Sequence, residues 1–228
     1  MKILPAALAV GMLGLAACSS QTKDTTTSAT GDPVGLKAVV INDALPYSTK
    51  NGDAWTGLAV DVLKAIQKEQ SEENATTELS YVEVGSVSEA KDALTNGTAN
   101  IVCGVGFSWK RSRQINYTLP FAVGGMRLLT TEGVDGTPES MKGKQIGVIT
   151  GSIPANLVES QLPEADAKGF DSPDAALKAL KDGEIATIAG GALWSKANMA
   201  EVPGSRMVPV RPYGRAGVGC AVTHGNDA

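Results

Sequence analysis

Short apolar runs alternate with helical patterns along most of the chain. The runs are rich in β-branched residues and almost continuously apolar, as expected of parallel strands that are buried on both faces. They lie at Ala38–Ile41, Leu79–Val84, Asn100–Val105, Ile146–Thr150, Ile185–Ala189 and Val218–Val222. Strands that alternate with helices predict an α/β fold.

Periodicity and capping signals predict helices between these runs. Apolar residues spaced four apart predict a helix that begins near Leu58 and runs toward Asn74. Ser86 followed by Glu89 is a capping-box pattern, which predicts a second helix that stops at Gly97.

The clearest helix signal lies farther along the chain. Ser172 supplies a cap, Pro173 occupies the first helical position, and Gly183 follows the last turn. A helix rich in Ala and Leu, an Asn-Gly or Asp-Gly pair and a buried strand then occur twice, at Ala90–Val102 and at Ala175–Ala189. Two copies are too few for a solenoid, but they suit two lobes of similar construction.

The first 35 residues are expected to serve export and attachment. Lys2 precedes an apolar run from Ile3 to Ala17, about fifteen residues, which is shorter than the roughly 20 needed to cross a bilayer. Residues 1–17 are therefore predicted to be a signal peptide. The run ends in Leu-Ala-Ala-Cys, which resembles a bacterial lipobox and predicts lipid attachment to Cys18. The alternative is an ordinary cleavage site beside an incidental cysteine. Residues 18–35 are rich in Ser and Thr and read as a tether.

Composition and charge narrow the function classes. The 228 residues are 43% hydrophobic and 19% charged, a normal globular mixture, and the net charge is −4. An acidic chain without a basic cluster offers little to phosphate backbones, so we expect no nucleic-acid partner. The single histidine, His224, gives little support to a Ser/His/Asp triad or a histidine-based metal site. We expect no cofactor and no metal.

Four stretches of the chain resemble the bacterial extracellular solute-binding proteins of family 3, the amino-acid-type receptors of ABC importers. They carry the sequences DALPY with WTGLAVD, LTNG with WKRSR and NYTLPF, KGKQIGVITGS, and FDS, and they lie at Leu36–Gln70, Ala93–Phe121, Lys142–Ser152 and Phe170–Ile188. Their order and spacing over residues 36–188 make the resemblance specific.

The resemblance implies a type 2 periplasmic-binding fold, in which two α/β lobes are joined by two crossover strands. Lobe one would comprise residues 36–123 and 213–228, and lobe two residues 124–212. A solute would bind between the lobes and stabilise their closed form. Family members usually continue for a further helix or two, so we expect either a truncated sequence or a reduced version of lobe one. The expected partners are a small solute, an ABC permease and, through the lipid, a membrane. We expect a monomer.

The family arginine that pairs with a ligand carboxylate aligns with Arg111. A guanidinium suits this task, because its rigid fork of donors matches a planar carboxylate. The alternative is an exposed arginine at the start of a helix, beside Lys110 and Arg113. Ser108 would cap that helix or donate its hydroxyl to the ligand.

Five further positions are expected at or near the cleft. Thr150, Gly151 and Ser152 lie where a strand meets a helix, so free backbone N–H groups there form an anion site or simply a capped tight turn. Gly104 would let the backbone approach the ligand from lobe one. Asp43 falls at or near a family position that lines the cleft, but it also suits a turn.

Two positions depart from the family pattern. An aromatic residue that stacks on the ligand in the family is replaced by Ala44, and the acid that receives a ligand ammonium is replaced by Gly191. A zwitterionic amino acid would lose a charged partner, at a cost of about 2–5 kcal/mol for a desolvated pair. An anionic or a larger solute therefore competes with an amino acid as the expected ligand. Trp109 and Trp194 could line the cleft rim or simply pack.

Two cysteines remain after Cys18. In an exported protein, Cys103 and Cys220 suggest a disulfide, and the family topology would place their strands side by side. The alternative is a pair of buried free thiols.

Three functions remain open from the sequence. The first is a solute receptor for an ABC importer, located on the outer side of a membrane. The second is an orphan receptor, or one that signals to a sensor. The third is an enzyme on the same fold, such as a cyclohexadienyl-dehydratase-like protein, which would need a carboxylic acid in the cleft. The segment at Gly190–Gly191 offers none, so we expect no enzyme activity.

Overall fold

The computed structural model describes residues 35–42, 44–73 and 77–224. The predicted signal peptide, the lipidation site at Cys18, most of the tether and Asp43 lie outside the described residues. In the part of the chain that is described, no helix is long and apolar enough to cross a membrane.

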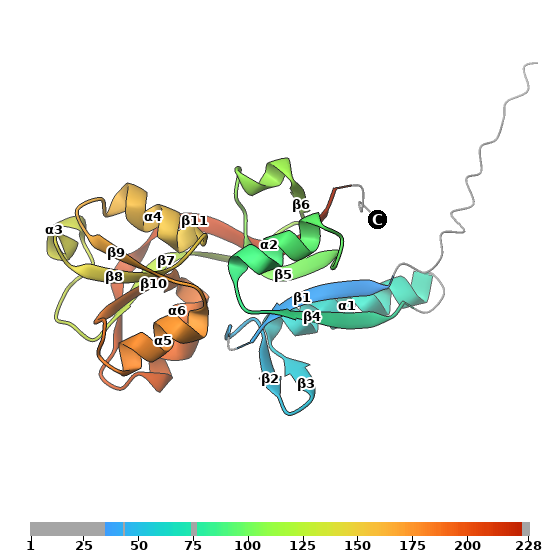
Figure 1. Cartoon of the computed structure of the whole chain (residues 1–228), viewed down its shortest axis with the longest axis horizontal. Coiled ribbons are helices and arrows are strands. Elements are labelled where there is room, and N and C mark those ends of the chain that lie inside the picture. The colour runs from blue at the N-terminus through green and yellow to red at the C-terminus, as the bar shows by residue number, and fades with distance from the viewer. Residues whose placement is uncertain (1–34, 43, 74–76, 225–228) are drawn as a thin grey trace, which may run out of the picture. The chain divides into compact units, whose positions relative to one another are not determined.

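The chain folds around one mixed sheet of nine strands (Figure 1). Their order is β4-β1-β5-β11-β7-β10-β8-β9, and β6 pairs with β11. The strands are β1 (Leu36–Ile41), β4 (Leu79–Val84), β5 (Ile101–Gly106), β6 (Ile115–Tyr117), β7 (Ala122–Thr130), β8 (Gln145–Ile149), β9 (Asp166–Phe170), β10 (Thr187–Gly191) and β11 (Arg206–Thr223). A separate hairpin joins β2 (Thr49–Asn51) to β3 (Ala54–Thr56).

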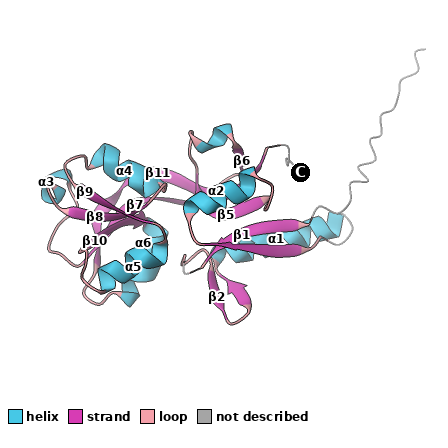
Figure 2. Cartoon of the chain, in the orientation of Figure 1, coloured by secondary structure: helices cyan, strands magenta, loops and turns pink. Residues whose placement is uncertain are grey.

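Helices occupy most of the connections between these strands (Figure 2). They are α1 (Leu58–Glu73), α2 (Val87–Thr95), α3 (Pro138–Met141), α4 (Ile153–Gln161), α5 (Pro173–Lys181) and α6 (Ala192–Asn198), with 3₁₀ turns η1 (Arg111–Arg113) and η2 (Met199–Glu201). The predicted α/β class is therefore confirmed.

Strand direction and packing divide the fold into two lobes. The strands β4, β1 and β5 are parallel to one another, and so are β10, β8 and β9. Between the two sets, β7 and β11 pair antiparallel with each other and with their outer neighbours. Each side has its own buried clusters, two that contain Leu63 and Leu94 and two that contain Leu128 and Ile188. Two long strands thus connect two α/β lobes.

The helix caps that the sequence predicted are present. The Ser86 hydroxyl accepts a hydrogen bond from the backbone N–H of Glu89 at 3.1 Å and caps α2. The Ser172 hydroxyl accepts one from Ala175 N–H at 3.1 Å and caps α5. Both helices end in a glycine with positive φ that bonds to the third residue before it. The repeated sequence pattern therefore forms the same local structure once in each lobe.

Some strands differ from the prediction. The run Ile185–Ala189 was expected to be a strand, but β10 begins two residues later, at Thr187. Ile185 is buried because it packs at the end of α5, where its N–H bonds to the Ala179 carbonyl. The strand predicted at Val218–Val222 is only the end of β11, which is 18 residues long.

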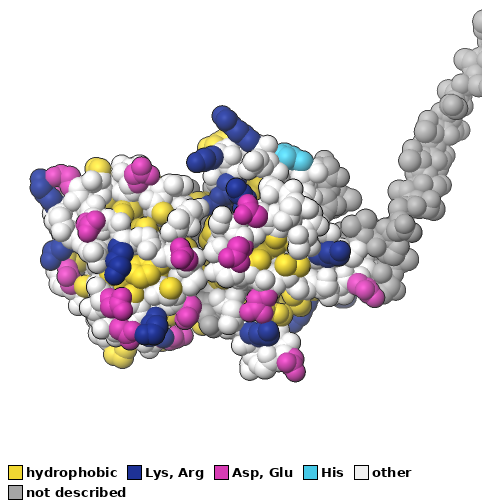
Figure 3. All heavy atoms as spheres, viewed as in Figure 1, with side chains coloured by type: hydrophobic (Ala, Val, Ile, Leu, Met, Phe, Trp, Pro, Cys, Tyr) yellow, Lys and Arg dark blue, Asp and Glu magenta, His cyan; other side chains and the backbone are white. Residues whose placement is uncertain are grey.

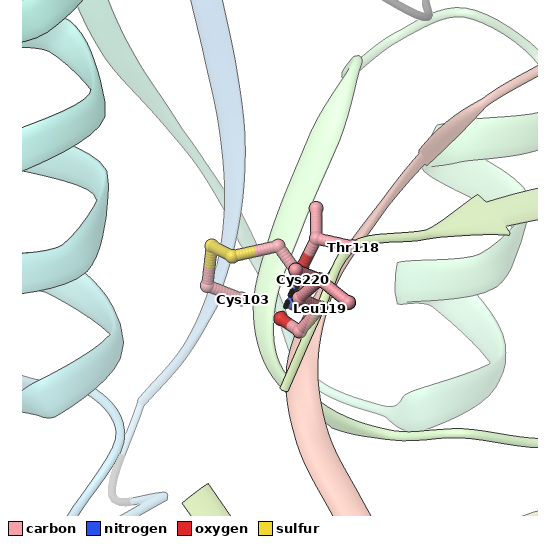
Figure 4. Close-up of a disulfide and its surroundings, with 4 residues drawn as sticks. All are labelled: Cys103, Thr118, Leu119 and Cys220. Atoms are coloured by element: carbon pink, nitrogen blue, oxygen red, sulfur yellow. Dashed lines mark hydrogen bonds between the residues drawn. A yellow bond between two sulfur atoms is a disulfide. The ribbon is translucent and has the colours of Figure 1, made fainter. Parts of the chain in front are cut away.

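A disulfide joins the two lobe-one strands β5 and β11 (Figure 4). Cys103 and Cys220 are register partners with Cα atoms 3.9 Å apart, and both side chains are buried. The Thr118 hydroxyl accepts a hydrogen bond from Cys220 N–H at 3.0 Å and donates one to the Leu119 carbonyl at 3.0 Å. The bridge links positions 117 residues apart in the sequence.

We expect the double substitution Cys103→Ala/Cys220→Ala to lower the free energy of unfolding by about 2–5 kcal/mol, because a long loop is no longer closed in the unfolded chain. Urea unfolding of the variant measures this loss. Dithiothreitol should destabilise the wild-type chain and leave the variant unchanged. A wild-type unfolding midpoint that does not respond to dithiothreitol would contradict the prediction.

Candidate functional site

A cavity of about 310 Å³ lies between the two lobes. Its walls come from the carboxyl ends of β1 and β5 in lobe one, from α4 and the β10–α6 junction in lobe two, and from the two connecting strands. A volume of this size is at the lower end of the range for small-molecule sites. Its position matches the cleft that the sequence predicted.

Much of the wall is backbone. Seven of the lining residues are glycines, namely Gly104, Gly106, Gly124, Gly125, Gly190, Gly191 and Gly214. Without side chains at these positions, peptide N–H and C=O groups are accessible to a bound molecule. The local structure also favours glycine at position 104, because its φ is +84° and a Cβ there would lie 3.0 Å from the Tyr47 side chain.

The remaining walls are mostly apolar and include aromatic rings. Tyr47, Phe107 and Trp194 line the cavity, together with aliphatic side chains such as Met126 and Leu157. Burial raises the pKa of the Tyr47 hydroxyl, so this group remains neutral at physiological pH. Tyr47 lies three residues after Ala44, which also lines the cavity, so an aromatic ring is present even though the family's aromatic position is alanine.

Among the described lining residues, the charged side chains are two arginines and no carboxylates. Arg111 is partly buried, and its Nη2 donates a 2.8 Å hydrogen bond to the Gly151 carbonyl. This bond joins η1 of lobe one to the turn before α4 of lobe two. Arg215 is exposed and, within the described part of the chain, makes no hydrogen bond or ion pair. The cavity therefore carries positive charge without an internal counter-ion among those residues.

An aromatic group lies beside Arg111. The Phe107 ring packs edge-on against Trp109, with centroids 4.9 Å apart, and lies 5.0 Å from the Tyr117 ring. Burial raises the pKa of the Tyr117 hydroxyl, while the positive charge of Arg111 opposes that rise. Trp109 is 81% exposed and does not line the cavity, whereas Trp194 lines it and is buried.

Some of the predicted site residues line the cavity, and others do not. Arg111, Gly104 and Ser152 line the cavity. Ser108 does not line it, and η1 is a single 3₁₀ turn whose N-cap is Lys110. The Ser108 carbonyl, rather than its hydroxyl, holds this turn by accepting the backbone N–H groups of residues 111 and 112.

The predicted anion site at residues 150–152 is occupied by local contacts. Thr150 N–H bonds to the Phe170 carbonyl, and the Ser152 hydroxyl caps α4 by accepting Ala155 N–H at 3.2 Å. Pro154 in the first turn has no N–H to offer. Gly151 contributes a carbonyl oxygen, which Arg111 binds. The turn therefore contacts the arginine directly.

Arg215 is the main site residue that the sequence did not indicate. It lies at an irregularity in the pairing of β11 with β7, where Tyr213 is opposite Met126 and Ala216 is opposite Gly124. Two residues of β11 therefore face the single residue Gly125, which is the geometry of a β-bulge. The sequence Pro-Tyr-Gly-Arg at residues 212–215 contains no apolar run that would predict a strand. The one available sign of a bulge was Gly214, because bulges favour glycine.

The exterior carries charges of both signs. Figure 3 shows Lys and Arg side chains interspersed with Asp and Glu side chains over the face in view. No single-sign patch comparable to a nucleic-acid footprint covers this face.

Comparisons with known proteins agree with this architecture. The family model of "Bacterial extracellular solute-binding proteins, family 3" matches residues 36–194. The ABC transporter arginine-binding protein 1 of Escherichia coli K12 is 26% identical over 132 residues, which are 56% of this chain and 54% of that protein. The chain thus spans about half the length of the curated relatives it matches.

Solved structures share the fold. An ancestral arginine-binding protein bound to glutamine superposes with a TM-score of 0.74 at 24% identity, covering 84% of this chain and 85% of the other. An ancestral amino-acid-binding protein described as a precursor of cyclohexadienyl dehydratase superposes with a TM-score of 0.72 at 19% identity, covering 84% and 83%. At these identities the likeness concerns the fold alone.

The contact between Gly104 and Tyr47 gives a stability prediction. Gly97 is the matched control, because its φ is +78° and a Cβ at that position would have no atom within 4 Å. Gly97→Ala should cost about 1–2 kcal/mol for the left-handed backbone alone. Gly104→Ala should cost about 1 kcal/mol more, because its Cβ also displaces the Tyr47 ring. Urea unfolding of the two variants measures the difference, and equal losses would contradict the assigned contact.

Proposed function

The chain belongs to the bacterial extracellular solute-binding proteins of family 3, and we propose that it captures a small carboxylate-bearing solute between its lobes for an ABC importer. The observation that carries this proposal is the cavity between the lobes with Arg111 on its wall. The curated relatives are ABC transporter arginine-binding proteins, which supports the importer role.

Arg111 is suited to hold the solute's carboxylate. A guanidinium has five N–H donors, and the bond to Gly151 uses one of them. The remaining donors can bind a carboxylate in the bidentate geometry that arginine favours. The hydrogen bond from Arg111 to Gly151 already joins the two lobes. A carboxylate bound to the same guanidinium would therefore lie close to both lobes. Binding there would favour the closed form.

We place lobe one at residues 36–123 and 213–228, and lobe two at residues 124–212. The division of buried clusters supports this placement, since the clusters around Leu63 and Leu94 belong to the first set of strands and those around Leu128 and Ile188 to the second. Asp43 and, on the cavity wall, Gly104 and Ser152 remain candidate ligand contacts.

Arginine itself is a poor candidate ligand despite the names of the curated relatives. An arginine ligand brings an ammonium and a guanidinium, and each needs an acceptor when it is desolvated. The described lining residues provide two guanidiniums of their own and no carboxylate. Like charges within one cavity oppose binding.

Binding is favoured over catalysis by the same residues. One structural relative is described as a precursor of cyclohexadienyl dehydratase. Elimination of water needs a group that moves a proton at the reacting atoms. The described lining residues include no Asp, Glu or His for that task. An orphan or sensor-linked receptor remains the alternative role, with the same cavity and the same solute chemistry.

We expect carboxylate solutes to raise the melting temperature of the full chain in a concentration-dependent manner, because they bind only the folded state. Arg111→Ala should weaken that binding about tenfold to a hundredfold through loss of a charge-assisted hydrogen bond. Differential scanning fluorimetry against amino acids, monocarboxylates and dicarboxylates measures both effects.

Arg113→Ala is the matched control, because Arg113 lies on the same 3₁₀ turn but is exposed and does not line the cavity. It should leave the shifts unchanged. If the chain melts cooperatively and none of these solutes raises its melting temperature, the receptor proposal is wrong.

We also propose that the chain is an exported lipoprotein anchored through Cys18, with residues 18–35 as its tether. The wild-type chain expressed in a Gram-negative host should partition into the detergent phase of a Triton X-114 separation, and Cys18→Ala should shift it to the aqueous phase. Cys103→Ala controls for loss of a cysteine elsewhere. Equal partitioning of wild type and Cys18→Ala would contradict the anchor.

A further inference from the structure

We infer that the cavity is built for a dicarboxylate without an ammonium group, with one carboxylate on Arg111 and the second on Arg215. This inference rests on the proposed function and specifies its solute. It depends on three features of the cavity, which are its unbalanced positive charge, the bulge that carries Arg215, and the open position at Gly191.

The charge of the lining selects for anions. Two guanidiniums face a small, mostly apolar space, and no carboxylate among the described lining residues neutralises them. The Arg111 guanidinium is partly buried, and a partly desolvated charge is most stable when an opposite charge shares its surroundings. The N-terminus of α4, where Ser152 and Ile153 line the cavity, adds a partial positive charge of the same sign. A single carboxylate would leave one guanidinium unmatched, whereas a dicarboxylate pairs with both.

The β-bulge explains how Arg215 reaches the cavity. In a regular strand, Gly214 and Arg215 would be opposite separate residues of β7, but here both face Gly125. Gly214 has a φ of +62°, the left-handed conformation that glycine supplies in such bulges. Bulges re-aim side chains beside functional sites. The lining residues on either side, Gly214 and Ala216, show that this whole turn of β11 faces the cavity.

No carboxylate among the described lining residues pairs with an ammonium group. Gly191 caps α6 with φ −61° and ψ 142°, an extended conformation that any residue can adopt. No atom lies within 4 Å of a Cβ at this position. A carboxylate would therefore fit there without strain, and aspartate is also a preferred N-cap residue. With glycine at this position, the space beside it has no carboxylate to balance a positive charge.

The apolar walls match the carbon chain that joins the two carboxylates. Tyr47, Phe107 and Trp194 contribute ring surface, and Val105 and Leu157 contribute aliphatic surface. Methylene groups are stabilised when they leave water and pack against such walls. In a short-chain dicarboxylate such as glutarate, the two carboxylates would thus pair with the two arginines and the carbon chain would pack against the apolar walls.

Three probes with the same five-carbon skeleton test the inference by isothermal titration calorimetry on the full chain. Pentanoate has one carboxylate, glutarate has two, and L-glutamate has two and an ammonium group. We expect glutarate to bind at least about tenfold more tightly than either of the others, because pentanoate leaves Arg215 unpaired and glutamate buries an unpaired cation.

Two substitutions assign these differences to residues. Arg215→Gln should remove the advantage of glutarate over pentanoate while pentanoate still binds. Gly191→Asp should reverse the preference between glutarate and glutamate, and the isosteric Gly191→Asn should not. Circular dichroism and melting temperature confirm that each variant is folded before its titration is interpreted.

The outcomes separate the inference from the proposed function. Glutamate binding the wild type as tightly as glutarate would overturn the inference and leave the receptor role intact, and loss of that binding in Asp43→Asn would identify the missing acceptor. An Arg215→Gln variant that keeps the full glutarate advantage would also overturn it. A folded chain that binds no carboxylate would overturn the proposed function itself.

Discussion

The antiparallel pairing of β7 with β11 is the constraint on which the two-lobed structure depends. Each strand hydrogen-bonds to the other and to an outer neighbour, β5 for β11 and β10 for β7. The parallel strands of each lobe therefore attach to one shared ladder, and every residue of that ladder near its middle lies between the lobes. The glycines at positions 124, 125 and 214 line the cavity for this reason. The disulfide between Cys103 and Cys220 links β11 to its outer neighbour β5.

The chemistry of the cavity follows from which side chains this backbone presents. Glycines at the crossing keep space open, and the bulge at Gly214 breaks the alternation of β11 beside Arg215, a charged residue that lines the cavity. Arg111 reaches the same space from the turn after β5 and contacts the opposite lobe through Gly151. Positive charge thus enters the cavity from one lobe and from a connecting strand, two independent structural sources.

Sequence reasoning was strongest where local physics determines the structure. Buried parallel strands and capped helices carry their signals within a few residues, so β1, β4 and β5 and the caps at Ser86 and Ser172 were predicted close to where they lie. The apolar pattern did not predict β7 and predicted only the end of β11, because β7 begins Ala-Val-Gly-Gly and β11 contains two prolines and three glycines. Such strands are formed by pairing with neighbours far away in the sequence, which periodicity does not register. Arg215 was missed for the same reason, whereas Arg111 was found through a family motif.

Membership of an amino-acid-receptor family sets the architecture more firmly than it sets the solute. The family match and the strand order account for where the cavity lies. Which ligand binds depends on a few side chains at the rim of the cavity, and Gly191 is one position where a change costs little structure. Its backbone is extended, the space around it is open, and it begins a helix whose cap would tolerate Asp, Asn or Ser equally. A glycine retained at such a permissive position removes a charge from the cavity without altering the fold. Solute class in this scaffold can therefore diverge through single residues while the strands that carry them stay fixed.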